Sequence, residues 1–404
     1  MTVASSRIAA LRQNPVALLM VMAAINYVGF ASWSALLNNF AKESVAFSGR
    51  DMGLLQSIRE IPGFLAFTAA AWILIMREQT LAYASLVVLG VGIALTGYFP
   101  TIIGLWMTTF IMSVGFHYYE TMAQSLTLQI VPKAQAPRVL GRIGSAQAIS
   151  QLSAFGVIML AWTLFNPSYE ALFLVSGLVV VCAGVATALF FPRFNGPVVQ
   201  RKGLVLRQRY WLYYALTFMV GARRQIFMAF GGFLLVEKFG FGVSKMALLL
   251  LITYAINTIA APRLGGAIAR FGERRTVMFE NITLIIVFLG YAVTDNPVLA
   301  AFFFITDGVF FTLTIAQRTY FQKIADPADI APTAGVAFTI NHIAAVFIPA
   351  VFGFIWLWNP SAVFAIGCGI ASVSLLLAFL IPDDPAPGNE TTFEARGNAV
   401  QPAQ

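Results

Sequence analysis

The chain has 404 residues, of which 59% are hydrophobic and only 10% are charged. About a quarter of the residues in an ordinary soluble protein are charged, so this composition excludes that class. The formal net charge is +8, but the basic residues concentrate at the ends of apolar segments. This distribution is typical of membrane topology and argues against nucleic-acid binding.

Apolar segments of about 20 residues recur along almost the whole chain, and each is long enough to span the hydrocarbon layer as a helix. The predicted fold class is therefore an all-α polytopic membrane protein with twelve transmembrane helices. The predicted spans are residues 15–40, 52–76, 81–99, 101–131, 141–163, 169–191, 211–236, 244–264, 275–294, 297–322, 333–357 and 361–381.

Basic residues are distributed unevenly between the two faces of this topology. Of the 25 Lys and Arg residues, four lie opposite the termini and three lie within spans, which leaves 18 on the face of the termini. Positively charged loops favour the cytoplasmic side. We therefore expect both termini to be cytoplasmic and the protein to lie in the cytoplasmic (inner) membrane.

The two halves of the sequence resemble each other at a shift of 193 to 194 residues. Phe-Asn-Pro-Ser at 165–168 reappears as Trp-Asn-Pro-Ser at 358–361. Six spans per half in the same orientation predict two parallel repeats. The predicted organisation is an N-terminal six-helix bundle, a cytoplasmic linker, a C-terminal six-helix bundle and a disordered cytoplasmic tail. These parts cover residues 1–191, 192–210, 211–381 and 382–404.

A second informative feature, besides the repeat, is the connection at residues 265–275. Its sequence is Gly-Gly-Ala-Ile-Ala-Arg-Phe-Gly-Glu-Arg-Arg. With it the sequence resembles the major facilitator superfamily of secondary transporters over residues 10–382. The resemblance implies that this connection is a cytoplasmic gating loop, although Ala269 stands where the family usually has aspartate. Glu280 is expected to pair with an arginine of this loop. The predicted gating residues are Arg59, Glu60, Gly265, Arg270, Gly272, Arg274, Arg275 and Glu280.

In proteins of that family, spans one, four, seven and ten line a central cavity. Span four carries His117 and Glu120 three residues apart, so they share one helix face, which Gln124 extends. The tyrosines beside this stripe could contact substrate or pack in the core. The predicted substrate-binding residues of all spans are Asn26, Tyr27, His117, Tyr118, Gln124, Arg223, Arg224, Gln225, Asn341 and His342.

Span seven carries two adjacent arginines, Arg223 and Arg224, near its middle. A charge at the bilayer centre costs about 2.5–3.5 kcal/mol on insertion scales, so it rarely lies there without a function. The two side chains diverge by about 100° around a helix. We expect one to meet an anionic substrate and the other to pair with Asp307 or Glu120. The alternative is that all buried arginines form internal structural or gating pairs.

Two deep carboxylates, Glu120 and Asp307, are the predicted proton carriers, because burial brings a carboxyl group towards a working proton affinity. The sequence has no Gly-Lys dipeptide to complete a phosphate-binding loop and no cluster of zinc ligands. We therefore expect no cofactor, and energy from an ion gradient or from the gradient of the solute.

The predicted function is a proton-coupled secondary active transporter that moves a small anionic solute, organic or inorganic, by alternating access. Its expected partners are this solute and the lipid bilayer, without nucleic acid, and the expected state is a monomer. The alternative is efflux of amphipathic drugs or metabolites. A more remote alternative is a membrane-embedded enzyme with His117 and Glu120 as an acid–base pair, but no nucleophile or metal ligand set accompanies them, so no enzyme activity is expected.

Overall fold

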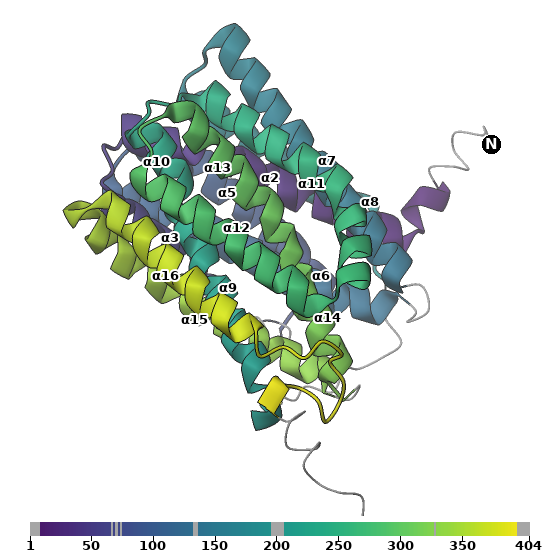
Figure 1. Cartoon of the computed structure of the whole chain (residues 1–404). Helices are drawn as coiled ribbons and strands as arrows, with labels where there is room; N and C mark the ends of the chain where they lie inside the picture. Colours follow the sequence, from purple (N-terminus) through teal and green to yellow (C-terminus); the bar gives the residue numbers. More distant parts are fainter. Residues whose placement is uncertain are drawn as a thin grey trace, which may run out of the picture. The chain divides into compact units, whose positions relative to one another are not determined.

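The computed structural model describes residues 9–65, 68, 72, 75–131, 136–194, 206–326 and 329–393, which are almost entirely helical (Figure 1). Within this part of the chain, ten helical segments are long and apolar enough to cross a membrane. The other two predicted spans correspond to α3 (Gly49–Phe64) and α6 (Ile102–Ile130). Much of the predicted span 52–76 beyond Phe64 lies outside the described residues.

Three helices begin with the same two residues, asparagine followed by proline. The asparagine side chain accepts hydrogen bonds from the first free backbone N–H groups of the helix, and proline already has the backbone angle that the first turn needs. At α13 (Pro297–Phe310), for example, Asn296 Oδ1 accepts from the N–H of Val298 at 2.8 Å. The other two are α2 (Pro15–Glu43), after Asn14, and α16 (Pro360–Ala378), after Asn359.

Contacts divide the chain into two compact units. Unit 1 consists of Met1–Phe47, Ile58–Arg201 and Phe241–Leu251. In this unit α5 (Glu78–Thr96) packs against both α6 and α8 (Tyr169–Phe190), while α2 packs against α8 and α7 (Ala136–Phe165). Unit 1 therefore contains the helices that carry Asn26, Arg59, His117 and Glu120.

Small residues allow α5 and α8 to approach closely, as is common between helices in membranes. A Cβ atom built on Gly90 of α5 would lie 2.7 Å from the carbonyl oxygen of Gly177 in α8. Real Cβ atoms do not approach backbone so closely, and neither helix can move without disturbing its other contacts. Gly90 thus fixes the spacing of this helix pair.

We expect Gly90→Ala to destabilise unit 1 by about 1–3 kcal/mol, because overpacking forces the backbones apart. The matched control is Gly156→Ala in α7, where an added Cβ has no atom within 4 Å. That change should be neutral or stabilise the helix by up to about 1 kcal/mol. Melting temperatures of the two purified variants test the difference, and equal melting temperatures would contradict it.

Unit 2 consists of Ser48–Ser57, Lys202–Gly240 and Ile252–Gln404. Here α9 (Trp211–Ile226) packs against α15 (Ile330–Trp358) and α16, and α12 (Glu273–Val293) packs against α13 and α16. Figure 1 shows α12 and α16 lying alongside each other. These helices carry Arg223, Glu280 and Asp307.

Two predicted spans of unit 2 are not uniform α-helices. After α9, the chain makes a π-helical segment, η4 (Phe227–Gly231), before α10 (Gly232–Glu237). After α13, it makes a 3-10 segment, η5 (Phe311–Thr314), before α14 (Ile315–Ile324). Such segments inside longer helices often accompany functional sites. Each here follows within four residues of a buried charged group, Arg223 or Asp307.

Candidate functional site

Arg223 forms a buried ion pair with Glu280. The Nη2 of Arg223, in the last turn of α9, donates to Oε1 of Glu280 in α12, and the two side chains are 2% and 0% exposed. The sequence-based partners of both residues were therefore wrong: Arg223 meets neither Asp307 nor Glu120, and Glu280 meets no arginine of the loop. Glu280 lies seven residues inside α12, which is about 10 Å along the helix axis and too deep for that loop.

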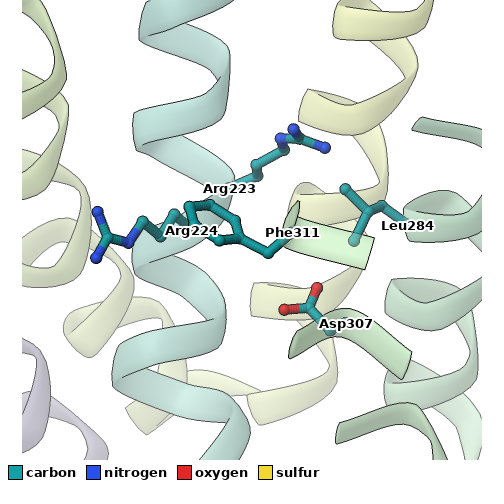
Figure 2. A pocket seen from close by; sticks show the side chains of 5 residues that line it. All are labelled: Arg223, Arg224, Leu284, Asp307 and Phe311. Carbon is teal, nitrogen blue, oxygen red and sulfur yellow. The ribbon is translucent and has the colours of Figure 1, made fainter. Parts of the chain in front are cut away.

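A small cavity lies beside this pair in unit 2. Its volume is about 10 Å³, which is room for about one water molecule. Figure 2 shows the five lining side chains, with the two guanidinium groups pointing away from each other. The lining residues are Arg223, Arg224, Leu284, Asp307 and Phe311.

The two adjacent arginines have different surroundings, as their divergence around the helix predicts. Arg224 is exposed, and its guanidinium carbon lies 5.2 Å from the centre of the Phe311 ring, within the range of a cation–π contact. Arg223 is enclosed. The buried positive charge of the site therefore belongs to Arg223.

Several polar atoms at this site have no hydrogen-bond partner among the described residues. They are Nε and Nη1 of Arg223 and Oε2 of Glu280. The carboxylate of Asp307, a residue that is 6% exposed, also makes no hydrogen bond within that part of the chain. A guanidinium offers five N–H donors and a carboxylate two acceptor oxygens, so the cluster can bind a further polar ligand or a proton.

Asn257 of α11 (Val243–Phe271) belongs to the surroundings of this site and is not among the residues predicted from the sequence. Its amide nitrogen donates to the carbonyl oxygen of Gly308, and its oxygen accepts from the hydroxyl of Thr312, both at 3.0 Å. Asn257 thus ties α11 to both sides of the junction between α13 and η5. The signal in the sequence was a single amide inside an apolar span.

The other predicted residues of unit 2 lie along α9 and α15. Asn341 packs against α9, where a Cβ on Gly221 would lie 3.1 Å from its carbonyl oxygen. The Nδ1 of His342 lies 2.9 Å from the carbonyl oxygen of Phe338. Gln225 is 2% exposed. None of the three predicted residues lines the cavity of Figure 2, so a role in binding remains a prediction for each.

In unit 1 the structure joins the predicted spans one and four. The amide nitrogen of Asn26, in α2, donates to Oε1 of Glu120, in α6, at 3.2 Å. Asn26 is fully buried and its own oxygen has no partner among the described residues. A neutral amide cannot balance the charge of an ionised carboxylate. Glu120 is therefore held by a polar contact and has no ion-pair partner among the described residues.

Arg59 and Glu60 of α3 form a buried ion pair, with 2.5 Å between Arg59 Nη2 and Glu60 Oε1. The carbonyl oxygen of Arg59 accepts from the hydroxyl of Ser113 in α6. A carboxylate oxygen of Glu60 lies within 4.8 Å of a ring nitrogen of His117. The predicted gating pair and the predicted substrate-binding histidine are thus neighbours within one unit.

The remaining predicted residues of unit 1 have separate surroundings. Tyr27 makes an edge contact with Phe116, with ring centres 6.3 Å apart. The hydroxyl of Tyr118 lies 2.6 Å from that of Thr68, and Gln124 is exposed. The sequence left core packing and substrate contact open for the tyrosines, and these contacts are compatible with both.

The connection between α11 and α12 turns at Gly272, whose φ of +82° suits glycine. Gly265 lies within α11. Arg274 pairs with Asp383 at 3.2 Å, and the guanidinium of Arg270 lies 5.5 Å from the ring centre of Phe271. Arg275 is exposed. A gating role for this connection remains a prediction.

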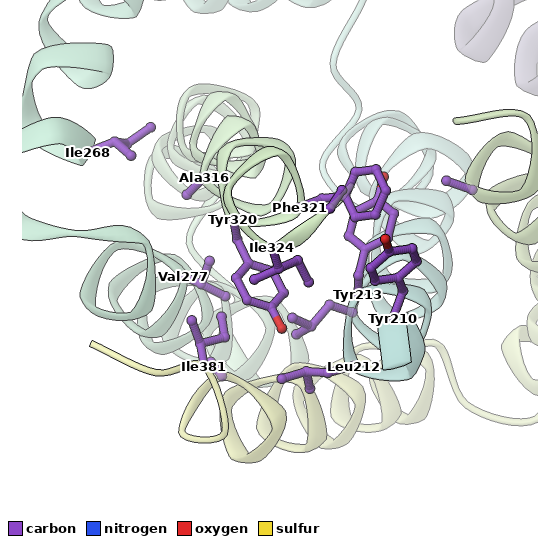
Figure 3. Packing of buried hydrophobic residues seen from close by; sticks show 14 residues of the cluster. Tyr210, Leu212, Tyr213, Ile268, Val277, Ala316, Tyr320, Phe321, Ile324 and Ile381 are labelled. Atoms are coloured by element: carbon purple, nitrogen blue, oxygen red, sulfur yellow. The ribbon is translucent and has the colours of Figure 1, made fainter. Parts of the chain in front are cut away.

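The prediction of a disordered tail is wrong for residues 382–393, which fold onto unit 2. Tyr320 belongs to a buried apolar cluster (Figure 3), and its hydroxyl donates to the carbonyl oxygen of Glu390 at 2.6 Å. The N–H of Thr392 donates to the carbonyl oxygen of Leu380 at 2.9 Å. A buried tyrosine hydroxyl needs a partner, and the tail provides it. Residues 394–404 lie outside the described part.

Asp329, just before α15, collects hydrogen bonds from the segment that precedes α9. Its carboxylate accepts from Nη2 of Arg207 at 2.9 Å and from the hydroxyl of Tyr210 at 2.8 Å. Asp329 is only 2% exposed. The hydrogen bond from Arg207, supported by that from Tyr210, lowers the pKa of Asp329 below its ordinary value.

This lowered pKa predicts a pH dependence of the free energy of unfolding. The stabilisation by Asp329 should be complete above the unfolded-state pKa of about 4 and should be lost as the pH falls through the lower folded-state pKa. Asp329→Asn lacks this contribution, so the difference in free energy of unfolding between wild type and variant should shrink as the pH falls. Unfolding curves at several pH values below about 5 test it. Asp295→Asn, whose side chain is 90% exposed, is the control and should follow wild type.

The fold is shared with solved transporter structures. The chain is 16% identical to the nucleoside transporter NupG, with a TM-score of 0.73 over 90% of this chain and 99% of that one. The chain is 12% identical to a bacterial homologue of the human lysosomal transporter Spinster, with a TM-score of 0.70 over 90% of this chain and 95% of that one. It is 11% identical to a bacterial homologue of the iron transporter ferroportin, with a TM-score of 0.71 over 90% of this chain and 97% of that one. No curated protein sequence matches the chain.

The sequence itself gives the family. The profile of the Major Facilitator Superfamily matches residues 19–349, which is most of the chain. The predicted fold class, an all-α membrane protein of this superfamily, is thereby confirmed. The chain belongs to the Major Facilitator Superfamily and is a multi-pass membrane transporter of that family.

Proposed function

We propose that the protein is a proton-coupled secondary transporter of a small anionic solute, with Arg223 as the anion-binding group. The observation that carries this proposal is the state of that guanidinium, which is enclosed in unit 2 with Nε and Nη1 unpaired. Arginine presents parallel donors that suit the oxygens of carboxylate, sulfate or phosphate. A neutral solute offers acceptors that form weaker hydrogen bonds with a guanidinium than charged oxygens do, and a cationic solute is repelled by it.

Proton coupling is proposed for Glu120 and Asp307. Each is a deep carboxyl group without an ion-pair partner among the described residues. Asp307 is buried and Glu120 is half-buried, and a charge without a counter-ion in such surroundings is costly, so each group is suited to hold a proton. Release and uptake of that proton on opposite sides of the membrane would drive the solute against its gradient.

The superfamily fold supports transport by alternating access, in which two repeats move around a fixed site. A ligand can drive this movement only if it binds one state more tightly than the other. The excess of Lys and Arg in the loops on the face of the termini supports a cytoplasmic-membrane location with both termini inside. We further propose that a single chain suffices for transport.

The decisive test is transport by the purified protein in proteoliposomes under an imposed pH gradient. We expect uptake of at least one labelled carboxylate, sulfate or phosphate compound, and loss of that uptake when a protonophore dissipates the gradient. Nucleosides, iron and cationic drugs are the compounds for comparison. The first two are included because solved structures with this fold are a nucleoside transporter and a homologue of an iron transporter. Transport of cationic amphipathic compounds without any anion would contradict the proposal and favour drug efflux.

A further inference from the structure

The ion pair of Arg223 and Glu280 uses only part of the hydrogen-bonding capacity of its members. One N–H of Arg223 donates to one oxygen of Glu280, while Nε, Nη1 and the second carboxylate oxygen are buried without partners among the described residues. A carboxylate that faced the guanidinium side-on would engage two nitrogens at once. The pair is therefore incompletely matched, and a better-oriented anion would gain bonds.

Space at the site restricts Arg223 to one anion at a time. The adjoining cavity, which Phe311 and Leu284 line together with Asp307 and the two arginines, has a volume of about 10 Å³ and accommodates about one water molecule. A carboxylate or sulfate group does not fit beside Glu280. A solute anion can reach Arg223 only when the carboxylate of Glu280 moves away.

Asp307 lines the same cavity but makes no hydrogen bond to Arg223. The carboxylate that holds the arginine is therefore specifically that of Glu280, from α12. An ionised arginine that lost this carboxylate without replacement would be a bare buried charge, which is strongly unfavourable. Exchange of one anion for another avoids that state.

We propose that Glu280 is the resident counter-ion of Arg223 and that the anionic group of the solute replaces it during transport. This inference rests on the proposed anion transport and adds a residue that sets its selectivity. Solutes whose oxygens engage two guanidinium nitrogens can displace Glu280, whereas weaker acceptors cannot. Glu280 thereby acts on specificity through Arg223 and need not touch the solute itself.

The experiment measures how sodium sulfate raises the melting temperature of the full-length purified protein, with ionic strength held constant by sodium chloride. Ligands that bind the folded state raise its melting temperature. In Glu280→Gln the resident charge is gone, so the half-maximal sulfate concentration should fall at least about tenfold below that of wild type, as close charge pairs are strongly coupled. Glu280→Gln/Arg223→Gln should lose the sulfate effect.

Glu273→Gln is the matched control, because it removes a buried carboxylate from the same helix, where Glu273 pairs with Lys323 at 2.9 Å, but leaves the pair of Arg223 and Glu280 intact. Its sulfate response should stay within about twofold of wild type, since the coupling tested is that of Arg223 with Glu280. An equal sulfate response in wild type and Glu280→Gln would overturn the inference. So would a fall in Glu273→Gln as large as that in Glu280→Gln, or a sulfate effect that survives loss of Arg223.

If Glu280→Gln does not purify in a folded state, Glu280→Asp provides the same test. The shorter side chain weakens contact with Arg223 while it keeps the charge, so the half-maximal sulfate concentration should again fall. The result of this sulfate experiment is independent of the result of the transport assay. Sulfate competition without anion uptake would refute the proposed function alone, whereas anion uptake with an unchanged sulfate response would refute the role of Glu280 alone.

Discussion

Arg223→Met is expected to destabilise the folded protein by about 3–5 kcal/mol, because it leaves Glu280 as an unpaired buried charge. Glu280 is 0% exposed, so water cannot replace the lost guanidinium. Arg223→Met/Glu280→Met removes both charges and should recover most of this loss, since apolar replacements of buried ion pairs are often neutral. Equilibrium unfolding in mixed micelles provides the free energies of unfolding of wild type, the single variant and the double variant.

The same variants separate stability from transport. The double variant should be folded and yet inactive in proteoliposomes, because it has lost the anion-binding group. The matched control is Arg224→Met, which removes a neighbouring but exposed arginine and a cation–π contact of about 0.5–1 kcal/mol. If the double variant transported anions at the wild-type rate, Arg223 and Glu280 would be a structural pair only.

The spans and their starts could be predicted from sequence because they depend on local properties. Apolar length decides whether a segment crosses the bilayer, and the Asn-Pro pairs at residues 14–15, 296–297 and 359–360 mark helix starts directly. Gly272 is a similar case, since its position in the loop anticipated a turn that needs positive φ. No knowledge of distant contacts was required.

The partner of Arg223 could not be predicted, because it depends on how α9 and α12 are rotated against each other. Spacing along one helix shows which residues share a face, but not which carboxylate of another helix lies opposite. The prediction of a disordered tail was wrong for a related reason. The composition of this tail is polar, and its docking depends on distant groups such as the buried hydroxyl of Tyr320, which donates to the carbonyl oxygen of Glu390.

The irregular segments η4 and η5 escaped prediction as well. Their residues continue the apolar pattern of the predicted spans, so composition does not distinguish a π or 3-10 turn from an α turn. The capping contact of Asn257 with Gly308 and Thr312 stabilises the local departure from α geometry at η5. Tertiary contacts of single polar residues thus decide the helix geometry next to Asp307.

Glu120→Gln is expected to abolish pH-driven accumulation of the solute while it preserves the fold. The amide oxygen of glutamine can still accept the hydrogen bond from Asn26, which joins α2 to α6 in the native protein. Glutamine cannot release or take up a proton at physiological pH, however. For one proton per solute, a gradient of one pH unit supports about tenfold accumulation, and this is the effect that should disappear.

Exchange of labelled for unlabelled solute needs no net proton movement, so it is the internal control for Glu120→Gln. We expect exchange within a few-fold of wild type, together with loss of gradient-driven uptake. Asn26→Leu is the matched structural variant, because it removes the hydrogen bond but leaves the carboxyl group, and it should retain coupling. Full gradient-driven uptake by Glu120→Gln would assign the proton elsewhere, and the same pair of assays on Asp307→Asn would then decide whether the second carboxyl group carries it.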